Sequence, residues 1–528
     1  MSAAIWVVLA LVVVAEVVLA RTGLAARLPK LVPWFGGAVR GLLALAAAGA
    51  AGDNVSLVVL LAVLAAARLG TAYVVGVVRP RMRQSIVAVG VADDYAERFR
   101  WSDYTSRTFA PIVAGFTSLS WALDLALGVV GAAAPRGAPL LAAVVTVVAL
   151  LEAGTHVAGI VLWNRRQGEL LRVVAAGVSE LEPRVVVYTA ALPESVANLE
   201  QWLPAVEATG TPAFVLTREL NVVARLASLS SLPVVYIKAL GGMEDLLPDS
   251  LRVALYVDTS TRNNHLLRNG SLTHVQLHHG DSDKASSSSR LLGLYDHHFV
   301  AGPAAVERLS TAGVISSAQQ ASIVGRPIAA SLEPRAVNRA EPIVLYAPTW
   351  EGYHQDNAVS SLGLGVAITS KLLAKPQVRT VVRPHPLTGR VDKSMAVVVD
   401  QMARLISGRP SAEMSSDPSA GAAIAALQRA DVLVTDVSSM LSDFLYTGRP
   451  ALVVDVADIG ADELVGRFPT LAAAYIVRPD LSDFDAKLAA ALDDDPLATQ
   501  RTAVARRTLG GLSGGGVDFA TALSRLSG

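Results

Sequence analysis

The stretch from Ala430 to Pro450 constrains the fold more than any other part of this 528-residue chain. Its first half, Asp431 to Thr435, is a short apolar run rich in β-branched residues, which is typical of a buried parallel strand. Ser438 then provides the N-cap of a run with helical apolar spacing, and Gly448 ends that run. A strand that leads through serines into a helix leaves backbone N–H groups for an anion. The pattern predicts either a phosphate site or a helix that the serines only cap.

Three upstream segments also end strand-like runs with polar residues. They are Leu277 to Gly280, Leu345 to Trp350, and Val382 to Pro386. In open α/β sheets, ligands bind at the carboxyl ends of the strands. Four such strand ends in one chain therefore predict one cleft.

Strand-like runs alternate with helical or loop segments after Arg172, which predicts doubly wound parallel sheets. The expected strands of the first sheet are Arg184 to Thr189, Ala213 to Thr217, Val234 to Lys238, Val253 to Val257, His274 to His278 and His298 to Ala301. Those of the second are Ile343 to Ala347, Thr380 to Arg383, Val432 to Thr435, Ala451 to Asp455 and Tyr475 to Val477. The Pro-marked segment from Arg326 to Pro342 is the expected hinge, and two Rossmann-like sheets around a cleft form the GT-B architecture.

The first third of the chain holds most of the excess apolar character, which reaches 52% hydrophobic residues and a mean hydropathy of +0.44 overall. Four or five membrane spans are expected, at residues 3–20, 36–52 (the weaker one), 55–78, 108–133 and 138–163. Basic residues gather in alternate connections, at Arg21, Arg27, Lys30, Arg79, Arg81, Arg83, Arg165, Arg166 and Arg172. By the positive-inside rule, everything after the last span is cytoplasmic. The expected domains are a transmembrane region at 1–165, Rossmann-like domains at 173–335 and 340–509, and a Gly-rich tail at 510–528.

Composition excludes several classes of protein. The 45 basic and 45 acidic residues balance, so no global charge favours nucleic acid. The chain has no cysteine, which excludes disulfides and thiolate chemistry. P-loop, GxSxG and kinase signatures are absent from the sequence. The pairs His278-His279 and His297-His298 are only weak candidates for a metal site, because adjacent residues of a strand point to opposite faces and neither pair supplies two ligands by itself.

Eight of the nine histidines lie between His265 and His385. His279 precedes Gly280, which lets the backbone approach a ligand closely. A neutral histidine near pH 7 is suited to remove a proton from an attacking hydroxyl, and Asp281 or Asp283 is a candidate to orient its ring. The alternative is a turn histidine that caps a helix.

Arg383 and His385, flanked by two prolines, form a stiff cationic tip after a buried strand. Arginine binds phosphate with two hydrogen bonds, and histidine donates another or protonates a leaving group. The alternative is a solvated turn. Asp443, early in the Ser438 helix, either contacts a ribose hydroxyl or lies at the surface. Two aromatic residues, Tyr346 and Trp350, either stack on a nucleobase or fill the domain interface.

Four motifs occur in order: His279-Gly280 with Lys284, Leu345 to Trp350, Arg383 to Pro386, and Thr435 to Ser439 with Arg449-Pro450. Together they resemble the CDP-glycerol glycerophosphotransferase family of teichoic-acid synthesis over roughly residues 270 to 460. The resemblance implies a GT-B fold, a CDP-polyol donor and no assigned cofactor. It also implies transfer of polyol phosphate to a hydroxyl of a lipid-linked acceptor.

The resemblance also implies roles for individual residues. His279 is the expected base, and His385 is expected to hold or protonate the diphosphate. The expected donor-binding residues are Arg383, Asp436, Ser438, Ser439, Asp443, Lys284 and Thr349. The chain departs from the family pattern at Asp281-Ser282-Asp283, Glu351 and Val437. A nucleotide-sugar glycosyltransferase and a catalytically inactive membrane scaffold remain the two alternatives.

Overall fold

The computed structural model describes residues 86–91, 138–190, 196–327, 329–338, 340–352, 359–510 and 517–528, together with residues 66 and 123. The chain divides into two compact units. One comprises residues 1–87 and 92–176, and the other comprises residues 88–91 and 177–528. The second unit contains both Rossmann-like domains and all of the residues predicted to form the site.

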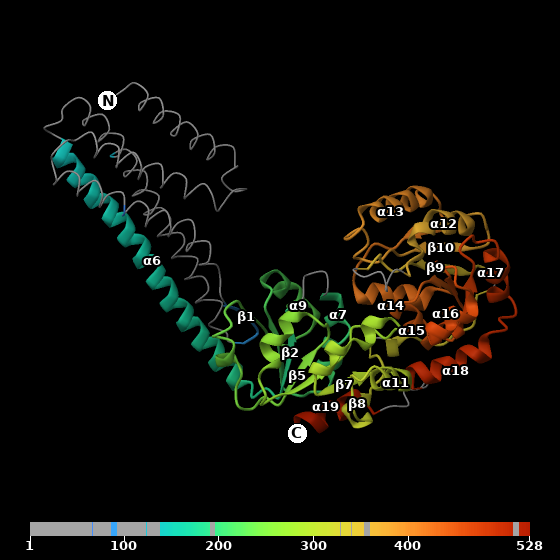
Figure 1. Cartoon of the computed structure of the whole chain (residues 1–528), viewed down its shortest axis with the longest axis horizontal. Helices are drawn as coiled ribbons and strands as arrows, with labels where there is room; N and C mark the ends of the chain where they lie inside the picture. The colour runs from blue at the N-terminus through green and yellow to red at the C-terminus, as the bar shows by residue number, and fades with distance from the viewer. Residues whose placement is uncertain are drawn as a thin grey trace. The chain divides into compact units, whose positions relative to one another are not determined.

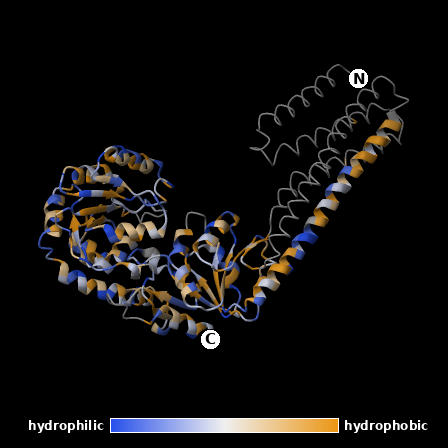
Figure 2. Ribbon diagram, turned by 180° about the vertical axis from the view of Figure 1, so that it is seen from behind, coloured by the Kyte–Doolittle hydropathy of each residue, from blue (hydrophilic) through white to orange (hydrophobic). Residues whose placement is uncertain are grey.

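Helix α6 (Ala138–Glu180) is the main described element of the N-terminal region. Its part from Ala143 to Glu180 is long and apolar enough to cross a membrane, and the colouring of Figure 2 shows hydrophobic residues along much of it. The helix contains the predicted span at 138–163 but continues for 17 further residues to Glu180. At 1.5 Å per residue it is about 65 Å long, roughly twice the thickness of a hydrocarbon core. The other predicted spans, at 3–20, 36–52, 55–78 and 108–133, lie outside the described residues, apart from the single helical residues 66 and 123.

The first sheet has eight strands in the order β1-β4-β3-β2-β5-β6-β7-β8. The strands are β1 (Ile86–Val89), β2 (Val185–Thr189), β3 (Ala213–Thr217), β4 (Val234–Ile237), β5 (Val253–Tyr256), β6 (Thr273–Gln276), β7 (His297–Val300) and β8 (Ala321–Ile323). The pairs from β4 through β8 are parallel. The six predicted strands are thus confirmed, with ends that differ by one or two residues. The prediction missed the short edge strands β1 and β8.

The second sheet has six strands in the order β11-β10-β9-β12-β13-β14, all parallel. The strands are β9 (Ile343–Ala347), β10 (Arg379–Val382), β11 (Ala412–Met414), β12 (Val432–Thr435), β13 (Ala451–Val454) and β14 (Ala474–Val477). The five predicted strands are confirmed, and the edge strand β11 was missed. Two parallel Rossmann-type sheets are therefore the fold of this part of the chain.

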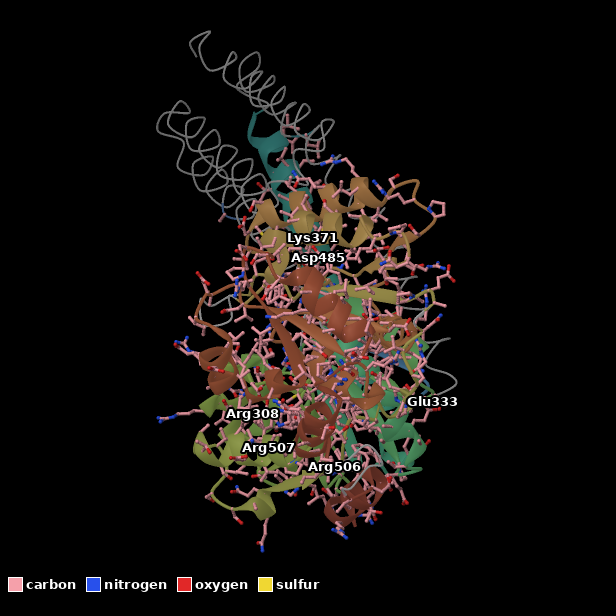
Figure 3. All side chains as sticks on the ribbon, turned by 90° about the vertical axis from the view of Figure 1, so that its right-hand side faces the viewer. Arg308, Glu333, Lys371, Asp485, Arg506 and Arg507 are labelled. Carbon is pink, nitrogen blue, oxygen red and sulfur yellow. The ribbon has the colours of Figure 1, made fainter. Side chains whose placement is uncertain are left out.

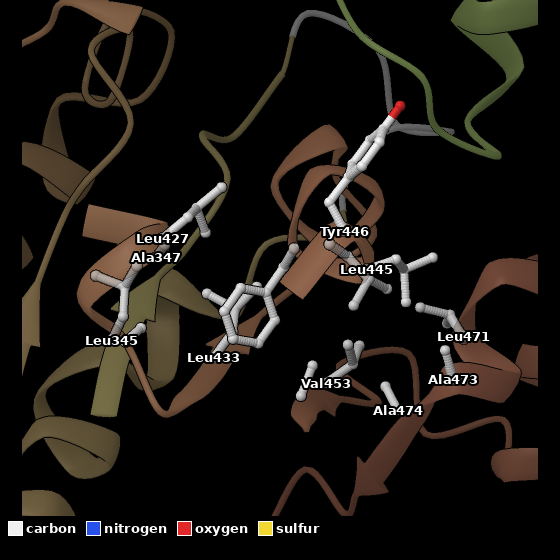
Figure 4. Close-up of a cluster of buried hydrophobic side chains, with 14 of the residues drawn as sticks. Leu345, Ala347, Leu427, Leu433, Leu445, Tyr446, Val453, Leu471, Ala473 and Ala474 are labelled. Atoms are coloured by element: carbon white, nitrogen blue, oxygen red, sulfur yellow. The ribbon is translucent and has the colours of Figure 1, made fainter. Parts of the chain in front are cut away.

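Helices cover both faces of the second sheet, because its strands are buried on both sides. On one face, Leu345, Leu433 and Val453 pack in the cluster drawn in Figure 4. The helices of this face are α14 (Ala420–Arg429), α15 (Ser439–Phe444), α16 (Ala461–Arg467) and α18 (Ala498–Leu509). The opposite face packs against α12 (Gly365–Leu373), α13 (Lys393–Ile406) and α17 (Phe484–Leu492). Figure 1 shows α12 and α13 on the side of β9 and β10 that faces away from α14.

The C-terminal end of the chain returns to the first domain. Helix α18 packs against α11 (Pro303–Thr311), which follows β7. The tail that follows α18 contains a further helix, α19 (Phe519–Ser527). Its Phe519 ring packs against Trp202 and Phe299, with ring centroids 5.6 and 5.7 Å apart. The last two helices therefore fix the second domain against the first.

Candidate active site

The loop that carries His279 leaves β6 through a strained turn. His278 has a φ of 58°, in the left-handed region that few residues other than glycine adopt. Two hydrogen bonds hold this turn: Trp202 Nε1 donates to the carbonyl oxygen of His278 at 2.9 Å, and the His278 N–H donates to Gln276 Oε1 at 3.1 Å. A strained backbone conformation that neighbouring groups stabilise is common where a functional side chain must point in one direction.

A second histidine supports the same turn. His278 Nε2 and His298 Nδ1 are 3.2 Å apart, and their ring planes are tilted by 32°. Burial lowers the pKa of both rings, that of His298 to about 4. Both are therefore neutral at pH 7, and one ring donates its single N–H to the other. This hydrogen bond between the two rings supports the loop that carries His279.

The side chain of His279 itself is exposed. Within the described part of the chain, no protein group forms a hydrogen bond with its ring. Its pKa lies below the ordinary value, because the surrounding protein displaces bulk water and because Arg326 and Lys284 are positively charged. An unprotonated imidazole at pH 7 with a free ring nitrogen has the state that a general base requires.

Gly280 brings this loop against the second domain. A Cβ atom at Gly280 would lie 2.8 Å from Ser439 Cβ and 3.0 Å from Ser439 Oγ. Any other residue would push the loop away from the start of α15. The carboxyl end of β6 in the first sheet thus meets the carboxyl end of β12 in the second, and the two strand ends lie in one site as predicted.

The start of α15 has the predicted strand–turn–helix form. Ser438 is the N-cap residue with an extended backbone, but its hydroxyl does not cap the helix. Ser438 Oγ lies 3.3 Å from Thr435 Oγ1, which itself donates to the Ala347 carbonyl oxygen at 2.7 Å. The interpretation of Ser438 as only a capping side chain is therefore wrong. Its role in binding a donor stays a prediction, as does that of Ser439.

Two polar residues hold the loop after β9. Lys284 connects it to the His279 loop, and Asp436 connects it to the end of β12. Lys284 Nζ donates to Thr349 Oγ1 at 3.3 Å. The fully buried Asp436 accepts hydrogen bonds from the backbone N–H groups of Thr349 and Ser361, at 2.7 and 3.0 Å. Burial raises the pKa of Asp436 to about 6, and the nearby Lys284 opposes this rise. Asp436 thus anchors two loops beside the site, which favours a positioning role over direct contact with the donor.

The two residues of the predicted cationic tip have different environments. Arg383 is buried, and its guanidinium donates to Ser415 Oγ at 2.8 Å and to the Ser419 carbonyl oxygen at 3.1 Å. These bonds fix the end of β10 to the segment before α14. The interpretation of the tip as a solvated turn is wrong for Arg383, and its binding of diphosphate stays a prediction.

His385 is held in one orientation. Its ring stacks on Trp350, with centroids 6.0 Å apart and planes 19° apart, and its Nδ1 accepts a hydrogen bond from the Leu387 N–H at 3.1 Å. The proton of the neutral ring is therefore on Nε2. Burial and the charge of Lys284 are the leading causes that lower the pKa of His385 to about 4. At pH 7 the neutral ring has one N–H, at Nε2, to donate, and its role at the leaving group stays a prediction.

We expect the His385 ring to remain neutral throughout the range from pH 5 to pH 8. Selective ¹⁵N labelling of histidine, with the signal assigned by His385→Gln, gives the protonation midpoint of the ring by NMR. The expected midpoint is about pH 4, because its pKa is lowered by burial and by neighbouring cations. A midpoint of pH 6.5 or above would show that His385 is protonated easily enough to act as a general acid.

The contacts of Glu351 account for one of the departures from the family pattern. Its carboxylate accepts hydrogen bonds from the backbone N–H groups of Gly389, Val391 and Asp392, at 3.1, 2.9 and 3.1 Å. Partial burial alone would raise the pKa of Glu351, but these bonds lower it. Glu351 therefore stabilises the loop after His385. The other candidate aromatic residue, Tyr346, is fully buried and donates to Ser361 rather than facing a nucleobase.

Arg326 is a site residue that the sequence did not indicate. Its guanidinium donates to both carboxylate oxygens of Asp443, at 2.5 and 3.1 Å, and to Gln201 Oε1 at 2.7 Å. Arg326 lies in the connection between the sheets, so it ties α15 to the first domain. Asp443 is buried, so its predicted place at the surface is wrong, and this ion pair favours a positioning role over ribose binding.

Asp281 and Asp283 pair with Arg308 of α11 rather than with His279. Arg308 donates to Asp281 and, at 3.1 Å, to Asp283. Asp283 also accepts the backbone N–H of Thr470 in the second domain at 2.7 Å. Arg308 is labelled in Figure 3. The expectation that one of these carboxylates orients the His279 ring is not met; they hold its loop between the two domains.

A small pocket lies behind the His279 loop. It is lined by His278, Gly280, Asp281, Ser287, Val300, Ala301, Ala305, Arg308, Leu309 and Arg326. The structure therefore brings His279, Lys284, Thr349, His385, Ser438 and Ser439 to one junction between the sheets. Arg383, Asp436 and Asp443 support that junction from the second domain.

Comparison with known proteins indicates the class of enzyme that this chain resembles. The model of the family described as "CDP-Glycerol:Poly(glycerophosphate) glycerophosphotransferase" matches residues 330–460, which include three of the four motifs. No curated protein matches the sequence.

Similar solved structures include the wall teichoic acid polymerase TagF, at 15% identity and a TM-score of 0.44 over 70% of this chain and 94% of that one. Another is MnaA of S. aureus in a co-structure with UDP, at 12% identity and a TM-score of 0.43 over 62% and 92%. A third is a glycosyltransferase from Rickettsia africae, at 10% identity and a TM-score of 0.40 over 65% and 97%.

The described fold has two Rossmann-like domains. The resemblance found in the sequence is confirmed by the family match over residues 330–460, which supports a CDP-glycerol glycerophosphotransferase-like enzyme.

Proposed function

We propose that this protein transfers a polyol phosphate, such as glycerol phosphate, from a CDP-activated donor to a hydroxyl of a lipid-linked acceptor of the cell envelope and releases CMP. One observation carries the proposal: an accessible His279 lies beside the positive charges of Lys284 and Arg326, on a loop that meets Ser439 and the His385 ring of the second domain. A base and an anion-stabilising group on opposite sides of one junction are what attack on a phosphorus atom requires.

The reaction would proceed by one displacement. His279 takes the proton of the acceptor hydroxyl, whose oxygen attacks the phosphorus that bears the polyol. The bond from this phosphorus to the bridging oxygen breaks, and that oxygen leaves with its electron pair as part of CMP. Lys284, the Nε2–H of His385, and the hydroxyls of Ser438 and Ser439 would stabilise the negative charge on the diphosphate.

Membrane attachment is part of the proposal. Helix α6 has the length and composition of a span, and the predicted spans before it would anchor the chain beside a lipid-linked acceptor. Basic residues after the last predicted span support a cytoplasmic position for the catalytic domains, where a CDP-activated donor would be available.

Release of CMP tests the reaction. We expect purified protein in lipid nanodiscs to release CMP from CDP-glycerol when membrane lipid extract is present as acceptor, and to form a new phosphodiester. Chromatography of the nucleotides and phosphorus NMR of the lipid product measure both results.

Turnover with a UDP- or GDP-sugar, but with none of CDP-glycerol, CDP-ribitol and other CDP-polyols, would replace this proposal by a glycosyltransferase. An absence of turnover with every nucleotide donor, together with a cellular phenotype that survives His279→Ala and His385→Ala, would indicate an inactive scaffold.

A further inference from the structure

A group of basic side chains lies at the carboxyl edge of the first sheet. Arg218 follows β3, Lys238 follows β4, and Arg262 and His265 follow β5. The Arg218 guanidinium joins them, because one terminal nitrogen lies 3.2 Å from His265 Nδ1 and the other donates to the Lys238 carbonyl oxygen at 2.7 Å. These four residues are named the edge cluster.

Among the residues that the structure describes, the edge cluster has more positive charge than its neighbours neutralise. Arg262 forms an ion pair with Glu219. Within the part of the chain that the structure describes, neither Arg218 nor Lys238 has a carboxylate in ion-pair distance, and Arg218 Nε is buried without an acceptor. The pKa of His265 lies below its ordinary value, because of desolvation and because three neighbouring guanidinium groups oppose its protonation.

The edge cluster lies along the same sheet edge as His279. The strand order from β4 to β6 is β4-β3-β2-β5-β6, and His279 follows β6. At about 4.8 Å between neighbouring strands, the end of β3 lies roughly 14 Å and the end of β4 roughly 19 Å from the end of β6. A chain-like ligand whose end reaches His279 and whose body crosses this edge would pass the cluster.

Phosphate is the ligand chemistry that this cluster fits. Guanidinium groups bind phosphate oxygens with two parallel hydrogen bonds, and an ammonium group adds a mobile charge. The proposed transfer leaves a phosphodiester directly behind the new terminal hydroxyl. An acceptor that has already received one unit therefore carries phosphate on the side away from the reacting oxygen.

We propose that the edge cluster binds a phosphodiester of the acceptor, behind the hydroxyl that His279 deprotonates. This inference rests on the proposed function and extends it. The cluster would make an acceptor that already contains phosphodiesters a better substrate than an alcohol without them. The enzyme would thus favour the elongation of a phosphodiester chain over its initiation.

Two acceptors test the inference on the full chain in detergent, with CDP-glycerol as donor. One is a lipid-linked alcohol without a phosphodiester, and the other is the same alcohol extended by glycerol phosphate units. Arg218→Gln should raise KM for the extended acceptor about tenfold, reducing the ratio of kcat/KM between the extended and the plain acceptor by the same factor. High salt should shrink the difference between the variant and the wild type.

Lys238→Gln provides a second variant, because its exposed ammonium has no acceptor to lose and the change should leave folding intact. It should lower the same ratio. Lys371→Gln is the matched control: it removes one positive charge from α12 of the second domain, where Lys371 pairs with Asp485 (Figure 3). The control should leave the ratio unchanged.

A binding measurement separates this inference from the proposed reaction. Soluble glycerol phosphate oligomers, used as a fluorescent probe, should bind the wild type more tightly than either edge variant, with or without turnover. Equal binding and an equal acceptor ratio in all proteins would overturn the inference. Loss of binding to anionic lipid vesicles, with the acceptor ratio unchanged, would also overturn it and assign the cluster to the membrane surface. Failure of the wild type to transfer to either acceptor would instead overturn the proposed function.

Discussion

Replacing His279 by alanine is expected to reduce kcat for CMP release by a factor of about 10² to 10⁴, which is the range that a positioned general base contributes. The ring is accessible, and no described protein group forms a hydrogen bond with it, so its removal should leave the fold intact. The measurement is the initial rate of CMP release from CDP-glycerol in nanodiscs at saturating donor, for the wild type and the variant.

His297→Ala is a matched control, because His297 lies in the same sheet, where its ring bonds Ser322 Oγ at 3.0 Å and contacts Phe299 edge-on. It should retain most of the activity. His279→Gln separates hydrogen bonding from proton transfer, since glutamine keeps a polar group but accepts no proton at neutral pH. A His279→Ala variant with more than about a tenth of the wild-type rate would show that another group removes the proton.

The pH dependence follows from the direction of the pKa shift. The base must be unprotonated, and the pKa of His279 in the free enzyme lies below 6.5. As the pH falls through this lowered pKa, kcat/KM should therefore decrease, and it should approach its plateau as the pH rises toward neutral. An acid limb centred above pH 6.5 would contradict the desolvated, cation-surrounded environment of the ring.

The strand ends of the site could be predicted because each is coded locally. Thr435 ends an apolar run, Ser438 precedes helical spacing, and Gly448 adopts the left-handed conformation that ends the helix. Parallel sheets bury both faces of a strand, so such runs are apolar throughout and easy to find. Because ligands gather at the carboxyl ends, the general place of the site followed from the same pattern.

The groups that support the site could not be predicted, because they come from distant parts of the chain. Arg326 and Asp443 are 117 residues apart, and Trp202 reaches His278 over 76 residues. No local pattern encodes such a pair. Asp436 shows the same limit: its motif indicates a site residue, but only its two backbone donors show that it holds loops in place.

Breaking the ion pair between Arg326 and Asp443 is expected to destabilise the protein strongly. Both side chains are nearly inaccessible, at 5% and 9% exposure. Arg326→Met would leave the Asp443 carboxylate buried without its partner, which is expected to lower the free energy of unfolding by about 3 to 5 kcal/mol. Urea denaturation of the detergent-solubilised protein, followed by tryptophan fluorescence, measures the shift of the transition that involves the domain junction.

A double replacement shows whether charge causes this loss. In Arg326→Met with Asp443→Leu, no buried charge remains, so most of the stability lost in Arg326→Met should return. The exposed ion pair of Lys371 and Asp485 is the contrast, since Lys371→Gln should change stability by less than about 1 kcal/mol.

The activity of the double variant would then separate two functions of the pair. Arg326 also bonds Gln201 in the first domain and contributes positive charge near His279. If the pair only stabilises the fold, the stable double variant should keep its kcat. If Arg326 also positions the domains, the double variant should be stable but slower. Its acid limb should also move to higher pH, because removal of the cation lets the pKa of His279 rise. A stable double variant with wild-type kcat and an unchanged pH profile would limit Arg326 to a structural role.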